Sequence, residues 1–280
     1  MKTILVPYHD EETARPALKA GILLANHFDS YLEGLLVFGE PVISFVPGTV
    51  VESQYLSAAG AEWRRYAERV RKGFSEATGT GGLPLTEFSP AGAGPAAGWK
   101  EMTGDEAEIV GQRGRLFDLI VIGRPASPSS RWREMRDAAL FDSGRPVLLT
   151  PAESRETIGT SIVIAWNGSI ETVRTIALGL PLLKVADRVE VLSVEGTNVG
   201  GPPATDVIAF LAWHGIPASS RTLEADERPT GEIILDEAGD IGADLIFKGA
   251  FTRSRLRQII FGGTTQHILD YARVPVLLAH

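Results

Sequence analysis

Short apolar runs alternate along this chain with longer segments in which apolar residues recur every three or four positions. The runs predict strands at 3–8, 31–38, 84–88, 117–122 and 146–150, and again at 161–166, 187–194, 217–223, 244–248 and 274–278. The longer segments predict helices at 11–27, 57–77, 101–114, 131–142, 170–183, 204–214, 230–241 and 264–272. In segment 170–183, Val173, Ile176, Ala177 and Leu180 have the spacing of a face packed on a sheet. Strands that alternate with helices predict a parallel sheet covered on both faces.

The same apolar runs occur twice, in the same order. The matching runs are TILVPY at Thr3 with SIVIAW at Ser161, DLIVIG at Asp118 with DLIFKG at Asp244, and PVLL at Pro146 with PVLL at Pro275. The number of residues that separates two matching runs is larger for the first pair than for the two later pairs. This difference predicts extra chain in the first half, around 39–58. We therefore predict two homologous domains, 1–150 and 160–280, joined by a polar stretch at 151–159.

Composition limits the classes of protein that this chain can represent. A length of 280 residues suits two ordinary domains, and 44% hydrophobic residues are enough for two cores. No apolar run is long enough to span a membrane, and the first residues lack the pattern of a secretory signal. The absence of cysteine excludes disulfides and thiolate metal sites and favours a cytoplasmic protein. A formal charge of −8 argues against nucleic acid as a partner.

The clearest candidate chemistry lies between Asp244 and Leu269. An apolar run ends there at Gly249, and two adjacent glycines, Gly262 and Gly263, interrupt any helix because each costs about 1 kcal/mol in propensity. A new helix is expected to start at the threonines that follow, a residue type suited to helix capping. A glycine at a strand end beside such a helix start exposes backbone N–H groups that suit a phosphate.

This stretch resembles the phosphate loop of universal stress proteins, whose nucleotide-binding members carry Gly-x2-Gly-x9-Gly-[Ser/Thr]. The chain has Gly249 and Gly262 at the first and third glycines, Thr252 at the second and Gly263 at the hydroxyl residue. If the loop needs a positive φ at Thr252, the threonine would cost about 1–2 kcal/mol. The neighbouring basic cluster around Arg253 is interpreted mainly as a solvated face.

The resemblance implies an α/β fold of two doubly wound domains, each a five-stranded parallel sheet in the order 3-2-1-4-5 with helices on both faces. A ligand crevice is then expected between strands 1 and 4. Family members often pair through their last strands. Residues 146–149 and 275–278 could pair in this way within one chain, as an internal pseudo-dimer, and a homodimer is a further expectation.

In nucleotide-binding members, an aspartate at the end of strand 1 contacts the adenine. The second half has Asn167 there, which can still donate and accept hydrogen bonds, although a turn or cap role is equally open. The neighbouring Trp166 is interpreted as a core residue. The first half has His9, interpreted as an exposed loop histidine, and of the loop pattern it keeps only Gly123. We expect no nucleotide in the first half.

Other motifs are weak. GAGPAA, at 92–97, matches a dinucleotide fingerprint in form, but it contains a proline and is interpreted as a loop. The histidines have no ligand spacing with carboxylates, so no metal site and no catalytic residue is predicted.

Three functions remain open. The chain could be a stress-response regulator that binds ATP or another adenine nucleotide, or an interaction module of the same family that acts on an unknown protein partner without nucleotide. The third, an enzyme such as a slow ATPase, lacks a recognisable general base. The candidate nucleotide-binding residues are Asn167, Gly249, Thr252, Arg253, Gly262, Gly263, Thr264 and Thr265.

Overall fold

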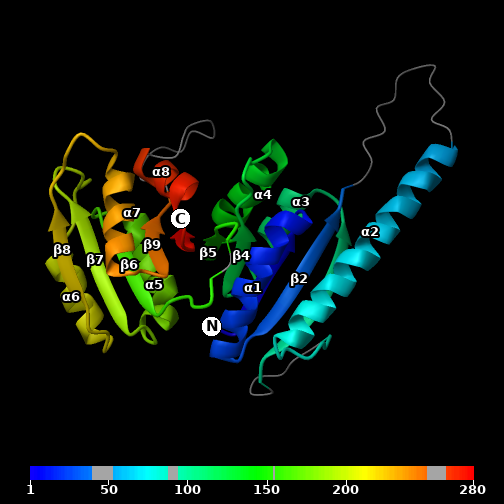
Figure 1. Cartoon of the computed structure of the whole chain (residues 1–280), viewed down its shortest axis with the longest axis horizontal. Helices are drawn as coiled ribbons and strands as arrows, with labels where there is room; N and C mark the ends of the chain where they lie inside the picture. Colours follow the sequence, from blue (N-terminus) through cyan, green and yellow to red (C-terminus); the bar gives the residue numbers. More distant parts are fainter. Residues whose placement is uncertain (40–52, 88–93, 154, 251–262) are drawn as a thin grey trace.

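The computed structural model describes residues 1–39, 53–87, 94–153, 155–250 and 263–280. Their strands form one continuous ten-stranded sheet that runs through both halves of the chain (Figure 1). Within the described residues, no helix is both long and apolar enough to cross a membrane. The extra chain predicted around 39–58 lies mostly outside the described residues.

Strands and helices alternate in both halves. The first half contains β1 (Thr3–Tyr8), α1 (Glu11–Phe28), β2 (Tyr31–Phe38), α2 (Ser53–Thr80), β3 (Ala96–Thr103), α3 (Glu106–Gly114), β4 (Leu119–Gly123), α4 (Ser130–Phe141) and β5 (Val147–Thr150). The second half contains β6 (Ser161–Ala165), α5 (Ile170–Leu183), β7 (Arg188–Val194), α6 (Ala204–Trp213), β8 (Ser219–Leu223), α7 (Thr230–Ile241), β9 (Leu245–Gly249), α8 (Gly263–Tyr271) and β10 (Val276–Ala279).

The strand order is β3-β2-β1-β4-β5-β10-β9-β6-β7-β8. Each half therefore has the order 3-2-1-4-5 with parallel neighbours, which confirms the predicted fold class. The two last strands, β5 and β10, pair antiparallel, with Leu148 opposite Leu277. The expected pairing of the two PVLL runs within one chain is present.

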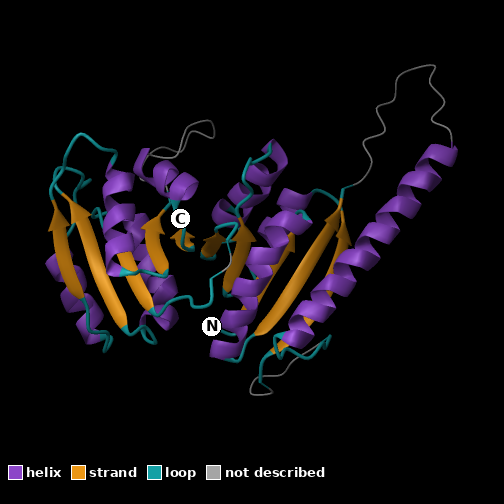
Figure 2. Ribbon diagram, viewed as in Figure 1, coloured by secondary structure: helices purple, strands orange, loops and turns teal. Residues whose placement is uncertain are grey.

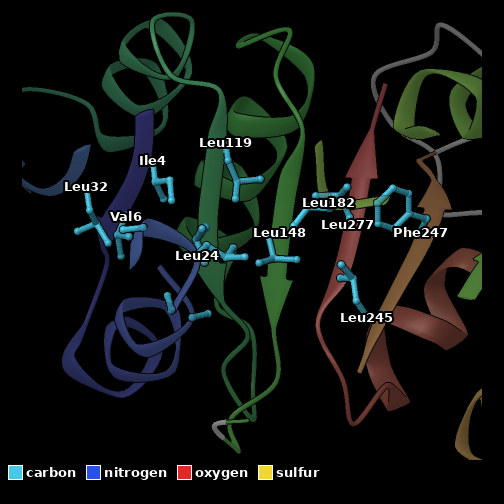
Figure 3. Close-up of a cluster of buried hydrophobic side chains, with 14 of the residues drawn as sticks. Ile4, Val6, Leu24, Leu32, Leu119, Leu148, Leu182, Leu245, Phe247 and Leu277 are labelled. Atoms are coloured by element: carbon cyan, nitrogen blue, oxygen red, sulfur yellow. The ribbon is translucent and has the colours of Figure 1, made fainter. Parts of the chain in front are cut away.

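Helices cover both faces of the sheet (Figure 2). Helices α1, α2, α5 and α6 pack on one face, and α3, α4, α7 and α8 pack on the other. Buried residues of the first face form one cluster that includes Leu148, Leu182 and Leu277, so the apolar core continues across the junction of the halves (Figure 3). Continuous apolar runs in the central strands fit this burial from both sides.

The prediction of a strand at 84–88 is wrong. The third strand of the first half is β3, which begins in the region interpreted as a loop and ends within the predicted helix 101–114, so that helix starts later than predicted; Leu85 forms only an isolated bridge with Ala97. Strand β3 lies at the sheet edge and begins with small residues that leave a weak hydrophobic pattern. A side chain at Gly98 would collide with the Tyr31 hydroxyl, so small size is required there.

Helix α5 has the predicted bounds but presents a different face to the sheet. Val173 is 46% exposed, whereas Thr172, Thr175, Ile176 and Gly179 are buried. The apolar residues of α5 occur on nearly all of its sides, so their spacing alone could not identify the face that packs on the sheet.

Candidate functional site

The candidate site lies at the carboxyl ends of β6 and β9 in the second half. These strands are neighbours, and the chain leaves them toward different sides of the sheet, because α5 and α8 cover opposite faces. Such a switch point is where open α/β sheets bind ligands.

Gly249, the last residue of β9, lies against the first turn of α5. A Cβ at this position would be 2.5 Å from the backbone nitrogen of Thr172. Gly123 has the same relationship in the first half, where a Cβ would meet the backbone carbonyl of Thr13. Close packing of helix on strand therefore requires both glycines, and Gly249 has a structural role whatever binds beside it.

Asn167 forms the turn between β6 and α5. Its side-chain oxygen accepts hydrogen bonds from the backbone nitrogen of Ser169 at 3.3 Å and from the Thr172 hydroxyl at 3.2 Å. Ser169 caps the helix by accepting from the Thr172 backbone nitrogen at 3.3 Å. Thr172 thus joins Asn167 to Gly249. The structure brings these two predicted site residues together, and it supports the turn role for Asn167.

The segment after β7 lies over this turn. The backbone nitrogen of Val199 donates to the Asn167 carbonyl at 3.1 Å, and the Trp166 indole donates to the Pro202 carbonyl at 3.1 Å. Trp166 is 3% exposed, so its interpretation as a core residue is correct. The polar groups at the end of β6 are thus largely satisfied within the protein.

The first turn of α8 contains three more predicted residues, Gly263, Thr264 and Thr265. Thr265 is 3% exposed, and the carbonyl of Thr264 lies 2.9 Å from where a Cβ on Gly231 of α7 would be. The starts of α7 and α8 therefore pack closely together. The remaining predicted residues, Thr252, Arg253 and Gly262, lie outside the described residues.

Sequence reasoning missed Lys248, the residue before Gly249. Its side chain is 3% exposed, and burial lowers the pKa of its ammonium to about 8, against a partly compensating effect of Glu171. A lysine within the otherwise apolar run DLIFKG was the signal that could have identified it.

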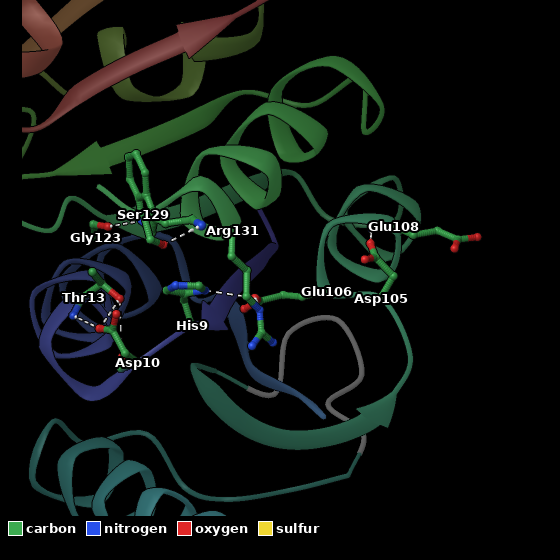
Figure 4. Close-up of polar contacts among 10 residues, drawn as sticks. His9, Asp10, Thr13, Asp105, Glu106, Glu108, Gly123, Ser129 and Arg131 are labelled. Carbon is green, nitrogen blue, oxygen red and sulfur yellow. Dashed lines mark hydrogen bonds and ion pairs between the residues drawn. The ribbon is translucent and has the colours of Figure 1, made fainter. Parts of the chain in front are cut away.

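The first half contains a polar cluster at the corresponding edge (Figure 4). Glu106, at the start of α3, has a side chain that is 4% exposed and accepts from Arg131 Nε at 2.8 Å; its carboxylate also lies 2.9 Å from His9 Nδ1. The interpretation of His9 as an exposed loop residue is wrong, because its side chain is 11% exposed. In the first half, the carboxylate of Glu106 therefore lies at the sheet edge that corresponds to the candidate site of the second half. Among the described residues, no group of three or more His, Asp or Glu side chains could hold a metal.

Two five-stranded doubly wound sheets joined through their last strands define the class of protein. Residues 211–280 match the model of the universal stress protein family. A stress response protein of Bacillus subtilis, NhaX, is 22% identical over 153 residues, which cover 49% of this chain and 90% of that protein. The chain is thus similar to universal stress proteins in sequence over its last quarter and in fold throughout.

Solved structures share the fold along the whole chain. A universal stress protein from Archaeoglobus fulgidus superposes with a TM-score of 0.70 at 16% identity, covering 99% of this chain and 97% of that one. A functionally unknown protein from Pseudomonas aeruginosa PAO1 has a TM-score of 0.55 at 17% identity, with coverage of 100% and 92%. At these identities the likeness concerns the fold.

Proposed function

We propose that this chain is a stress-response regulator whose second half binds an adenine nucleotide such as ATP. Similarity of residues 211–280 to the universal stress protein family, and of the chain to the stress response protein NhaX, supports the stress-response role. The observation that carries the nucleotide proposal is the convergence at one sheet edge of Asn167, Gly249 and the start of α8. A switch point beside a helix start with threonines suits a phosphorylated ligand.

In this proposal the phosphates lie at the first turn of α8. Backbone N–H groups of Gly263, Thr264 and Thr265 supply donors, and the helix dipole favours negative charge. The amide nitrogen of Asn167, whose oxygen is engaged within the turn, is the group available to the base. Thr252, Arg253 and Gly262 join the proposed site through the family resemblance alone.

One observation favours a second function, an interaction module that works without nucleotide. The Asn167 side-chain oxygen already accepts two hydrogen bonds, and Val199 and Pro202 bond to the same turn. A ligand base would then have few unsatisfied protein groups to meet. Such a module would act on a protein partner that remains to be identified.

Two measurements test the nucleotide proposal. Mass analysis of small molecules released by denaturing freshly purified protein should detect an adenine nucleotide, and calorimetric titration should give a finite ATP affinity. Thr252→Gly combined with Gly263→Ser restores the family pattern. If the loop holds residue 252 at positive φ, as the family pattern implies, relief of that strain and one new hydrogen bond, at about 1 kcal/mol each, should tighten ATP binding by roughly 10- to 100-fold.

Gly79→Ser is the matched control, because Gly79 is an exposed glycine of α2 with open space around it. It should leave ATP affinity unchanged. If neither the parent nor the restored variant binds ATP, the interaction module is the better function. The proposed role is binding without catalysis in the cytoplasm, so sustained phosphate release from ATP would contradict it.

A further inference from the structure

Lys248 lies on the face of β9 that α7 and α8 cover. Leu245 and Phe247 belong to the core cluster of the opposite face, and Ile246 and Ala250 belong to this one. Side chains alternate along a strand, so Lys248 points with Ile246 toward α7 and α8. Its neighbours in the sheet, Ala165 of β6 and Leu278 of β10, are apolar.

The ammonium of Lys248 has no hydrogen-bond or ion-pair partner among the described residues. The charged group that acts on its pKa is Glu171, in the first turn of α5 at the carboxyl edge of the sheet. Lys248 is the residue before the last of β9, so it lies near that edge. The first turn of α7 contains Glu232, and the first turn of α8 contains no acidic side chain; His267 follows in the second turn of α8.

The fold does not need a lysine at this position. In the first half, Ile122 precedes Gly123 as Lys248 precedes Gly249, and Ile122 is 1% exposed. An apolar side chain therefore fills the equivalent place. A lysine that is 3% exposed and has no ion-pair partner in the described part of the chain is costly, and such residues concentrate at functional sites.

The surroundings favour an anion as the missing counter-ion. Helix α8 starts at this edge with Gly263 and the buried Thr265, and α7 starts beside it without a side-chain cap. Two helix starts direct backbone N–H groups and positive dipole ends to the region where the lysine lies. A lone cation among such groups is unfavourable until an anion arrives.

We propose that Lys248 binds the phosphate group of the ligand in the second-half crevice, together with the first turn of α8. The inference rests on the proposed function and assigns the charge recognition to a residue outside the loop motif. Free phosphate and a nucleotide share this chemistry. Both should depend on Lys248, whereas adenosine, which has no phosphate, should not.

Binding should also be linked to protons. An anion beside the ammonium favours its charged form and raises the pKa of Lys248 above the value of about 8 in the free protein. At pH 8, where the free lysine is about half protonated, binding should therefore take up close to half a proton. Contact by the helix start alone would produce no such uptake.

The test is calorimetric titration with inorganic phosphate, ATP and adenosine at pH 8, in two buffers of different ionisation enthalpy. The proteins are the parent, Lys248→Met and Lys184→Met, the last replacing an exposed lysine at the end of α5. Lys248→Met should weaken phosphate and ATP binding by roughly 10- to 100-fold and abolish proton uptake. Lys184→Met should match the parent.

The outcomes separate this inference from the proposed function. If phosphate binding depends on Lys248 and ATP does not bind, the result supports the lysine site and contradicts the proposal that the second half binds a nucleotide. If the parent and Lys248→Met bind ATP with equal affinity, the result supports nucleotide binding and overturns the role proposed for Lys248. Absence of binding by both phosphate and ATP overturns both proposals. Circular dichroism of each variant confirms that the comparison concerns folded protein.

Discussion

The backbone nitrogen of Thr172 lies 2.5 Å from the position that a Cβ on Gly249 would occupy. The start of α5 therefore rests directly on the end of β9, and the obstacle is backbone, which cannot rotate away. This contact explains why the strand ends in glycine without reference to a ligand.

Gly249→Ala should lower the free energy of unfolding by about 1–3 kcal/mol, the usual cost of overpacking. Urea denaturation measures the change. Gly239→Ala is the control, because Gly239 is an exposed residue of α7 with no atom near its Cβ position, and it should gain about 1 kcal/mol in helix propensity. Equal stability of Gly249→Ala and the parent would mean that the contact is looser than described.

Much of the fold could be predicted, because apolar runs identify buried parallel strands well. Strand β3 was missed since an edge strand of small and charged residues has little hydrophobic pattern. The packed face of α5 was missed because apolar residues occur on both of its sides. The strand order came from the family resemblance, which local pattern alone does not supply.

The candidate site was predictable only in part. Glycines and hydroxyl residues identified the edge near Gly249 and Thr265, but their contacts depend on folding. His9 and Glu106 are 97 residues apart, so their pairing has no local signal. Lys248 could have been found as a cation in an apolar run, although its lack of a partner is visible only in three dimensions.

Lys248→Met should make the protein more stable, by an amount that depends on pH. The folded-state pKa of about 8 lies below the usual 10.5, so the folded protein releases this proton more readily than the unfolded chain. The cost of the buried charge is therefore fully present below pH 8 and relieved as pH rises from 8 toward 10.5. At pH 7 the variant should gain about 3 kcal/mol, falling to roughly half near pH 9.5.

The measurement is urea denaturation of the parent and Lys248→Met between pH 7 and about 9.5. The series ends there because burial raises the pKa of Tyr8, whose contribution to stability is lost as pH rises further. A stability difference that does not vary with pH would show that Lys248 titrates normally in the folded protein.

Arg124 links the two halves away from the sheet. Its guanidinium donates to the carbonyl of Leu269 and, at 2.7 Å, to the carbonyl of Ala272, at the end of α8. Carbonyls at a helix end lack partners within the helix, and a cation there is favoured by the dipole. Burial lowers the pKa of Arg124. Loss of this side chain should therefore weaken the packing of α8 against the first half.

Arg124→Met should reduce the free energy of unfolding by about 1–3 kcal/mol. Chemical denaturation followed by tryptophan fluorescence checks this value. Arg15→Met, at an exposed position of α1, should stay within about 0.5 kcal/mol of the parent. If Arg124→Met and Arg15→Met have the same free energy of unfolding, the contacts of Arg124 do not stabilise the packing of the two halves.

Glu106 is the buried centre of the first-half cluster. Its Oε2 lies 2.9 Å from His9 Nδ1 and 2.8 Å from Arg131 Nε, and its side chain is 4% exposed. Hydrogen bonds to an ionised group are stronger than neutral ones. A carboxylate that holds two partners, one just after β1 and one in α4, should thus stabilise the first half.

Glu106→Gln keeps the shape of the side chain and one acceptor oxygen but removes the charge. We expect a loss of about 1–3 kcal/mol in the free energy of unfolding at pH 7, measured by urea denaturation. Glu108→Gln is the matched control, since Glu108 is exposed on the same helix and bonds only to Gln112 through its side chain. Arg131→Met should cost more than Glu106→Gln, because it leaves a buried carboxylate short of a partner, whereas Glu106→Gln leaves an arginine that is 57% exposed and can be solvated. The reverse order would mean that the carboxylate of Glu106 is compensated without Arg131.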